Sequence, residues 1–449
     1  MKVPKLHYTV VGAIAFAASA AVGSIAYEIV FVIICLVAFL KRSYVLPLLF
    51  LSGLLKVAPI SHAFRIDITL LYVIIFSLYS LPFIFRPSAL NKNRRFINVL
   101  ILLMFVTVGA SLLLTKATWY YTSKSGIFIV TLYLPLLLLI ANRVDSEVQS
   151  EFISGFKTVV VILANAWVGV GFYNMIHQIQ LTQFENAEAV VTHVSSYGEN
   201  YMYFSSFLVY VFMHSFIELY FERRLVILNF FLLIVYTYLL LNSPARGLTI
   251  GLVFSLTVLV ALSLKKLSVR QIINLSCLAA VVTVGVYFYL TSGSDLTAIK
   301  RLVSFDPGSK SIADRISAIV VAFDEWNSNV FYILFGMGTD SVAYLNGDPG
   351  LYAHNLVLEL IFEYGLVGSI PLLVFFAISF VFAWHEVKRG FFQKNGNIIW
   401  LVGVYFILLS FSMFSNTLGN MRPLWIVIAL LLTVNFNRQS QALAYETAH

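Results

Sequence analysis

Apolar runs of about 20 residues alternate with short polar breaks along almost the whole chain. A helix needs about 20 residues to cross roughly 30 Å of hydrocarbon, so each run predicts a membrane-spanning helix. Breaks at charged residues, proline and glycine give about fourteen spans; about 12–14 are expected, because the first two share one nearly continuous run. The predicted spans are residues 8–22, 25–40, 44–60, 67–85, 96–115, 125–142, 156–176, 203–221, 225–241, 248–264, 271–290, 356–384, 397–415 and 423–437. The pattern predicts an all-α, polytopic membrane helical bundle.

Basic residues fall mainly in every second turn between the predicted spans. With the N-terminus in the cytoplasm, the cytoplasmic turns hold Lys41, Arg42, Arg86, Lys92, Arg94, Arg95, Arg143, Arg223, Arg224, Lys265, Lys266, Arg270, Lys388, Arg389 and Lys394. The short turns on the other side hold only Arg65, Lys116, Lys124, Arg246 and Arg422. This distribution follows the positive-inside rule and predicts that two long loops, 177–202 and 291–355, lie outside the cytoplasm. Within the second loop, Ile312 to Trp326 has apolar residues at helical spacing, which predicts an amphipathic helix on the membrane surface or over the bundle.

Composition excludes a soluble protein. Hydrophobic residues make up 60% of the chain and charged residues 11%, with a mean hydropathy of +0.89, whereas soluble proteins carry roughly 25% charged residues. A polytopic bundle is one domain whatever its length, so we expect a single transmembrane domain over residues 1–449. The cytoplasmic turns account for most of the net charge of +8, which therefore does not indicate nucleic-acid binding. Cys35 and Cys277 lie in apolar runs and predict no disulfide framework, and the first run follows Lys2 and Lys5 as in a signal-anchor.

Arginines on the predicted outer side are candidates for substrate binding, because topology does not explain their charge. Arg246 lies in the tight turn 242–247, where its planar guanidinium suits phosphate oxygens; an interfacial anchor is the alternative. Arg65 stands near Asp67, and these two charges could simply neutralise each other. Arg315 opens the predicted amphipathic helix, where it could point inward over the bundle. The same loop holds Lys300, Arg301 and Lys310, for which solvation is the alternative.

His354 immediately precedes a long apolar helix and is the second candidate. A neutral imidazole there could act as a general base or hydrogen-bond a substrate hydroxyl, and the positive end of the helix dipole disfavours its protonation. A structural interfacial histidine is the alternative. Asn355 is expected to cap the helix. Glu359 and Glu363 follow four residues apart on one helix face, where intramembrane carboxylates indicate either a site or ion-pair partners for a loop arginine.

These residues resemble the signature of the O-antigen polymerase and O-antigen ligase superfamily. Its order of Gly-x-Gly, then His-Asn, then Glu-x-Gly-(Leu/Ile)-x-Gly is similar to Gly336-Met337-Gly338, His354-Asn355 and Glu363-Tyr364-Gly365-Leu366-Val367-Gly368, with Arg315 before them. The turn Ser243-Pro244-Ala245-Arg246-Gly247 is similar to the family's Ser-Arg-Gly turn before a span. Arg65-Ile66-Asp67 resembles an element after an early span, and Asn200 resembles an Asn that opens a span in mid-chain.

The resemblance implies a GT-C-like integral membrane glycosyltransferase that uses neither metal nor nucleotide cofactor. Its donor would be an undecaprenyl-pyrophosphate-linked oligosaccharide, its acceptor a sugar hydroxyl, and its active site would face the periplasm at the bacterial inner membrane. Arg246 and Arg315 would hold the pyrophosphate and stabilise the charge that grows as the anomeric bond breaks. His354 would orient or deprotonate the attacking hydroxyl. The residues expected to bind substrate are Arg65, Asn200, Arg301, Asn355 and Glu363.

Several functions remain open at this stage. A polymerase and a ligase share the signature and the donor but differ in acceptor, which is another lipid-linked repeat or a lipid A core. Two outer loops in different halves of the chain and the larger number of spans favour the polymerase, with a chain-length-regulating co-polymerase as an expected partner. A flippase or transporter for lipid-linked sugars would place charges deep inside several spans, whereas here the ionisable residues are expected to gather at one face, in a loop and at helix ends. A non-catalytic assembly protein predicts that His354→Ala leaves glycan output intact.

Overall fold

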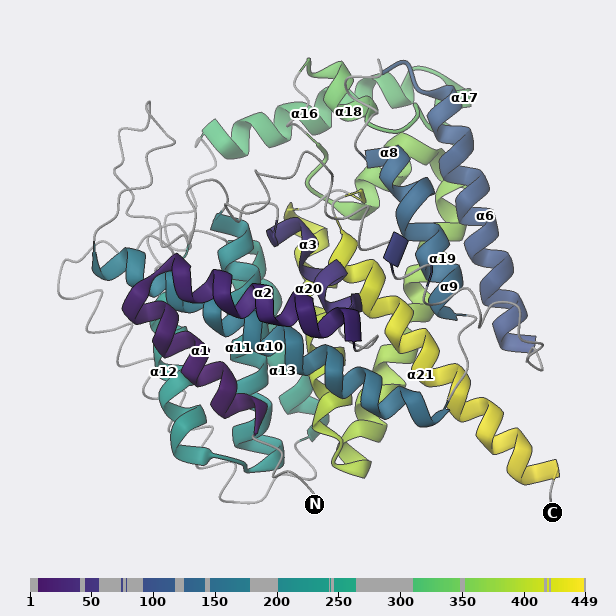
Figure 1. Ribbon diagram of the computed structural model, residues 1–449. Coiled ribbons are helices and arrows are strands. Elements are labelled where there is room, and N and C mark those ends of the chain that lie inside the picture. The colour runs from purple at the N-terminus through teal and green to yellow at the C-terminus, as the bar shows by residue number, and fades with distance from the viewer. Residues whose placement is uncertain are drawn as a thin grey trace. The chain divides into compact units, whose positions relative to one another are not determined.

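The computed structural model of the protein describes most of the chain as helix (Figure 1). The described residues are 7–40, 45–55, 74–75, 78, 92–117, 125–141, 146–177, 201–241, 243, 246–263, 310–347, 352–415, 418–419 and 421–447. Within these ranges every element is an α-helix or a π-helical turn, and there is no strand. The all-α prediction is confirmed.

Five helices in the described part of the chain are long and apolar enough to cross a membrane. They are Arg94–Leu114, Ile153–Asn174, Phe204–Glu222, Leu356–Gln393 and Gly396–Phe414, and shorter apolar helices accompany them. Each lies on a predicted span, so the prediction of a polytopic helical membrane protein is confirmed. The predicted span 271–290, most of 67–85 and most of the loop 177–202 lie outside the described residues.

The chain is divided into two compact units, and the prediction of a single domain over residues 1–449 stays a prediction. The first unit comprises Met1–Ile68, Ile153–Phe305 and Val387–Ile407. Its described helices, whole or in part, are α1 (Tyr8–Val22), α2 (Ser24–Leu40), α3 (Val45–Leu55), α10 (Ser146–Ile176), α11 (Tyr201–Ile217), the π-helical turn η3 (Glu218–Glu222), α12 (Val226–Leu241), α13 (Arg246–Ser263) and α20 (Gly396–Ser415). Helix α11 packs against α12 and α13, and α1 packs against α2. In this core the ring of Trp167 lies edge-on to Tyr27, with ring centroids 4.6 Å apart, a favoured aromatic geometry.

The second unit comprises Thr69–Phe152, Asp306–Glu386 and Leu408–His449. Its described helices are α6 (Lys92–Leu114), the continuous run α8 (Ser125–Phe128), η2 (Ile129–Tyr133) and α9 (Leu134–Ala141), then α16 (Lys310–Asn327), α17 (Val330–Phe335), α18 (Ser341–Leu345), α19 (Leu356–Gln393) and α21 (Arg422–Thr447). Helix α9 packs against α6 and α21. Helix α16 packs against α17 and α18, and Figure 1 shows these three at one end of α6.

The described part of the long loop predicted at 291–355 is folded rather than extended. The amphipathic helix predicted at 312–326 is confirmed as α16, whereas α17 and α18 were not predicted. Helix α19 continues past the predicted end at residue 384, to Gln393, and contains a break at Gly365. This break and the loop helices build the candidate site.

Candidate active site

A short backbone pairing joins the turn after α17 to the first part of α19. The N–H of Met337 donates to the carbonyl of Phe362 at 2.9 Å, and the N–H of Gly338 donates to the carbonyl of Glu363 at 3.0 Å. In an unbroken helix these carbonyls would accept from N–H groups four residues further along. The break at Gly365 (φ 67°, ψ 179°) therefore leaves two carbonyls for the loop turn to pair with.

Two glycines make this close approach sterically feasible. Gly336 has φ 81° and ψ 173°, and Gly365 has a similar conformation, in a region open essentially only to glycine. A Cβ on Gly336 would overlap the carbonyl of Glu363, and a Cβ on Gly365 would overlap the backbone of Leu334 and Gly336. We call the pairing of residues 336–338 with 362–365 the glycine lock. It explains why the Gly-x-Gly and Glu-x-Gly motifs occur together, since each supplies half of one structure.

The C-terminal end of α6 holds the same turn through Thr339. Ser111 Oγ lies 2.8 Å from Thr339 Oγ1, and Thr115 Oγ1 donates to the carbonyl of Thr339 at 2.8 Å. A Cβ on Gly338 would meet the backbone of Thr115. Sequence reasoning missed these contacts; the available signal was the pair of hydroxyl residues, four apart, at the end of an otherwise apolar run.

Asn355 caps α19, as predicted. Its Oδ1 accepts from the N–H of Val357 at 3.0 Å and of Leu358 at 3.1 Å, which satisfies two otherwise unpaired donors of the first helical turn. Its Nδ2 donates to the carbonyl of Met413 in α20 at 3.2 Å. Asn355 was predicted to bind substrate, and in this structure its side chain holds protein backbone on both sides.

Glu359 and Glu363 continue the same helix face and also hold backbone. Glu359 Oε1 accepts from the N–H of Leu418 at 2.8 Å, and Glu363 Oε1 accepts from the N–H of Asp340 at 2.9 Å. Both carboxyl groups are buried. Among the described residues, the sequence-based alternative of an ion pair with a loop arginine is not observed for either one. At intervals of four residues, Asn355, Glu359 and Glu363 each fix a different segment against α19.

Glu363 can therefore be tested as a positioning residue. We expect Glu363→Gln to retain most of the wild-type stability, because the amide oxygen can still accept from Asp340. Glu363→Leu leaves that buried N–H without a partner and should lower the free energy of unfolding by about 1–3 kcal/mol. Thermal unfolding in detergent measures both variants. Equal losses in the two variants would show that the negative charge, rather than the acceptor, is what matters at this position.

His354 lies directly before the cap, in a left-handed backbone conformation with φ 52°. Its ring centroid is 3.8 Å from that of Tyr352. Its Nδ1 is buried and, in the described part of the chain, has no hydrogen-bond partner. Burial, and then the positive charge of Arg315, lower the pKa of His354 to about 4. The lowered pKa agrees in direction with the predicted disfavouring of protonation, and its causes are burial and then Arg315.

Arg315 lies on the inward face of α16. It precedes the fully buried Ala318 and Ala322 by three and seven residues, so the three side chains share one side of the helix. Ala322 packs in a small core with Met337 and Phe362, both part of the glycine lock. This placement agrees with the predicted inward orientation, and the positive charge of Arg315 acts on the pKa of His354.

The calls on the other predicted site residues stay predictions. Helix α13 begins at Arg246, in the first compact unit. Ser243, just before it, is buried, and its hydroxyl is hydrogen-bonded to that of Ser205. The predictions for Arg65, Asn200 and Arg301 fall outside the described residues. Within the described ranges, no group of three or more His, Cys, Asp and Glu side chains could hold a metal ion.

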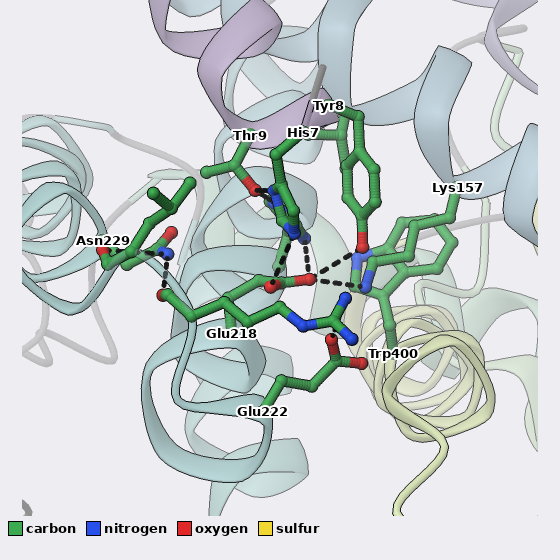
Figure 2. A network of polar contacts seen from close by, with 12 residues as sticks. His7, Tyr8, Thr9, Lys157, Glu218, Glu222, Asn229 and Trp400 are labelled. Carbon is green, nitrogen blue, oxygen red and sulfur yellow. Dashed lines mark hydrogen bonds and ion pairs between the residues drawn. The ribbon is translucent and has the colours of Figure 1, made fainter. Parts of the chain in front are cut away.

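A second buried polar cluster lies in the first unit, centred on Glu218 (Figure 2). Glu218 Oε1 accepts from the hydroxyl of Tyr8 at 2.7 Å and lies 3.4 Å from Nζ of Lys157. His7 Nε2 and His214 Nδ1 approach the same carboxylate at 3.6 and 3.9 Å. The cluster thus joins the first turn of α1 to α10 and α11.

Sequence reasoning missed this cluster, although a signal was present. Lys157 and His214 lie inside helices long and apolar enough to span a membrane, and ionisable residues there are costly unless they are paired. The expectation that ionisable residues gather at one face, in a loop and at helix ends does not hold for them. Lys157 and His214 each lie close to the carboxylate of Glu218, so the cluster links α1, α10 and α11.

The fold and the site define a helical integral membrane protein with a folded loop fixed against a broken span. Comparison with known proteins adds that residues 228–373 match the family model described as O-antigen ligase. This range includes α13, the loop helices, the glycine lock and His354. Residues 228–373 are therefore similar to the O-antigen ligase family, which agrees with the resemblance seen in the sequence. No curated protein matches the chain.

Proposed function

We propose that this protein is a membrane glycosyltransferase that polymerises undecaprenyl-pyrophosphate-linked oligosaccharide repeats into O-antigen or a similar surface polysaccharide. The observation that carries the proposal is His354, whose buried Nδ1 has no hydrogen-bond partner in the described part of the chain and whose pKa is lowered by burial and by the positive charge of Arg315. A neutral imidazole that can accept a proton, together with a cation that acts on it, suits a reaction in which a hydroxyl attacks and a pyrophosphate leaves. The family match over residues 228–373 supports the same class of reaction.

The proposed reaction balances without a redox step. The acceptor hydroxyl attacks the anomeric carbon of the donor, a new glycosidic bond forms, and the bond to the pyrophosphate breaks. The hydroxyl proton passes to His354, and undecaprenyl pyrophosphate leaves with both electrons of the broken bond. Arg315, together with Arg246, stabilises the negative charge that grows on the pyrophosphate. The two long outer loops, in different halves of the chain, favour a lipid-linked repeat as acceptor.

The site is proposed to work at the periplasmic face of the bacterial inner membrane, without a metal ion. The polyprenyl tail would remain in the lipid while the pyrophosphate enters below α16. We expect the protein to transfer glycan also when a metal chelator is present. A chain-length-regulating co-polymerase is the proposed protein partner.

A glycan gel from cells lacking the gene tests the proposal. A polymerase predicts that long chains shrink to a single repeat on the lipid core. Loss of every attached repeat, with lipid-linked polymer accumulating, would indicate the ligase alternative. Loss of the attached repeats and of the lipid-linked polymer, with lipid-linked repeats retained on the cytoplasmic side, would indicate a flippase. An unchanged ladder would contradict a transferase role for that glycan.

The pH profile provides a sharper test of His354. Since the neutral imidazole is the active form, activity should be full above the folded-state pKa and should fall as pH drops through about 4. We expect no inflection of kcat/KM near pH 6.5 in the wild-type protein. In Arg315→Gln one of the two causes of the low pKa of His354 is removed. The fall in activity at low pH, the acidic limb of the profile, should therefore occur at a higher pH. Lys116→Gln, a change at an exposed cation that does not act on the His354 pKa, should leave the limb in place. A wild-type inflection near 6.5 would contradict the assignment.

Arg246→Lys tests whether the guanidinium fork matters. Lysine keeps the charge but loses the planar, bidentate geometry. We expect kcat/KM to fall at least about tenfold, which corresponds to roughly 1.4 kcal/mol. Arg224→Lys is the matched control, because Arg224 is exposed and pairs with Glu222. Full activity of Arg246→Lys would rule out bidentate phosphate binding by this residue.

A further inference from the structure

Helix α17 exposes most of its apolar side chains. Of its six residues, Val330, Phe331, Leu334 and Phe335 are each 38–70% exposed. We call these four side chains the α17 face. Soluble surfaces rarely carry so many adjacent large apolar side chains, and such patches mark contacts with membranes or other proteins.

The α17 face lies near the exposed apolar surface of α6. Only 33% of the spanning window of α6 is buried within the protein, and at its end Leu113 is 88% exposed. Just beyond, Lys116 Nζ lies 3.5 Å from Glu325 of α16 and 5.0 Å from the ring centroid of Tyr332 in α17. These contacts hold α17 at the end of α6, where Figure 1 also shows it.

A second span flanks α17 on another side. The backbone of Leu334 is in close contact with Gly365, at the break in α19. The residues that follow the break, Leu366, Val367 and Ile370, are exposed on a helix long and apolar enough to span the membrane. The α17 face therefore continues the lipid-exposed surfaces of both α6 and α19.

We propose that α17 lies in the membrane interface, with the α17 face among the lipid headgroups and the first acyl carbons. Lys116 then sits at the level where a long cationic side chain extends its amine to the headgroups. Because α17 leads directly into Gly336, lipid contact holds one half of the glycine lock at the membrane boundary. This inference rests on exposure and contacts alone and does not depend on the proposed function.

Site-specific fluorescence in vesicles tests the placement. Single-cysteine variants Phe331→Cys and Phe335→Cys, made in the full chain with Cys35→Ala and Cys277→Ala, are labelled with an environment-sensitive fluorophore. The proteins are reconstituted into phosphatidylcholine vesicles. Leu113→Cys serves as the lipid-facing control, and Asp324→Cys, at an exposed polar residue of α16, serves as the water-facing control.

Quenching by two agents separates the outcomes. We expect labels at 331 and 335 to be quenched by lipids carrying a shallow nitroxide as strongly as the label at 113, and several-fold less by aqueous iodide than the label at 324. Iodide quenching at 331 and 335 equal to that at 324 would overturn the proposal. Protection from both agents would also overturn it, because the face would then be covered by protein, either a second copy or a partner.

Discussion

Replacing Gly365 by alanine is expected to abolish glycan transfer and to destabilise the second unit. Alanine in this backbone region costs about 1–3 kcal/mol. Its Cβ would also overlap the backbone of Leu334 and Gly336, so the lock must open. Opening it removes the hydrogen bonds donated by Met337 and Gly338, each worth roughly 0.5–1.5 kcal/mol. Thermal unfolding in detergent and the glycan ladder measure the two effects.

Gly336→Ala should reproduce this loss, since Gly336 supplies the other half of the lock. Gly109→Ala is the matched control: it lies in α6, and a Cβ added there would meet nothing within 4 Å. In a helix interior this change is expected to be neutral or stabilising by about 0.5–1 kcal/mol. Wild-type melting and activity in Gly365→Ala would show that the break in α19 is not required.

Replacing Glu218 by leucine is expected to lower the free energy of unfolding by about 3–5 kcal/mol. Both Glu218 and Lys157 have fully buried side chains, so removal of the carboxylate leaves an ammonium group in an apolar interior without its counter-charge. The hydroxyl of Tyr8 loses its acceptor in the same variant. Because these contacts hold the first turn of α1, we expect that turn to become accessible to protease.

The double variant Lys157→Met with Glu218→Leu distinguishes a paired charge from simple loss of volume. Buried ion pairs replaced by apolar residues of similar size are often neutral or stabilising, so the double variant should regain most of the stability. Lys116→Leu, which breaks an exposed pair with Glu325, should change stability by less than about 1 kcal/mol. A double variant as unstable as Glu218→Leu would contradict an electrostatic origin.

Much of the fold follows from local pattern. The apolar runs that became α6, α10 and α11 are long enough to identify without tertiary information, and the amphipathic spacing of α16 is visible in sequence. Asn355 was predicted as a cap because capping depends on the next three residues. Features determined by near neighbours along the chain could therefore be predicted from the sequence.

Features that depend on contacts between residues far apart in the sequence could not be predicted from it. Gly365 lies in an apolar run that reads as uninterrupted helix, and only contact with Gly336 requires its unusual backbone conformation. Helix α17 is too short for its periodicity to be recognised. The charges of Lys157 and Glu218 could be located in sequence, but not their pairing, since it depends on how α10 and α11 pack.

For the site, sequence reasoning predicted His354 and Arg315 as catalytic residues, and in the structure the charge of Arg315 acts on the pKa of His354. It also assigned Asn355 and Glu363 to substrate, which stays a prediction; in the structure their side chains hold protein backbone. Residue type alone cannot separate these roles, because a carboxylate or amide that binds a sugar hydroxyl can equally bind a backbone N–H.

The most direct test is transfer by the purified protein in vesicles. Undecaprenyl-pyrophosphate-linked repeats serve as both donor and acceptor, with a chelator present, and products are followed as a ladder together with released undecaprenyl pyrophosphate. We expect the wild-type protein to extend the chains and His354→Ala to be slower by about 10²–10⁴-fold, with unchanged melting. Equal rates in the two proteins would contradict the assignment of the chemistry to His354.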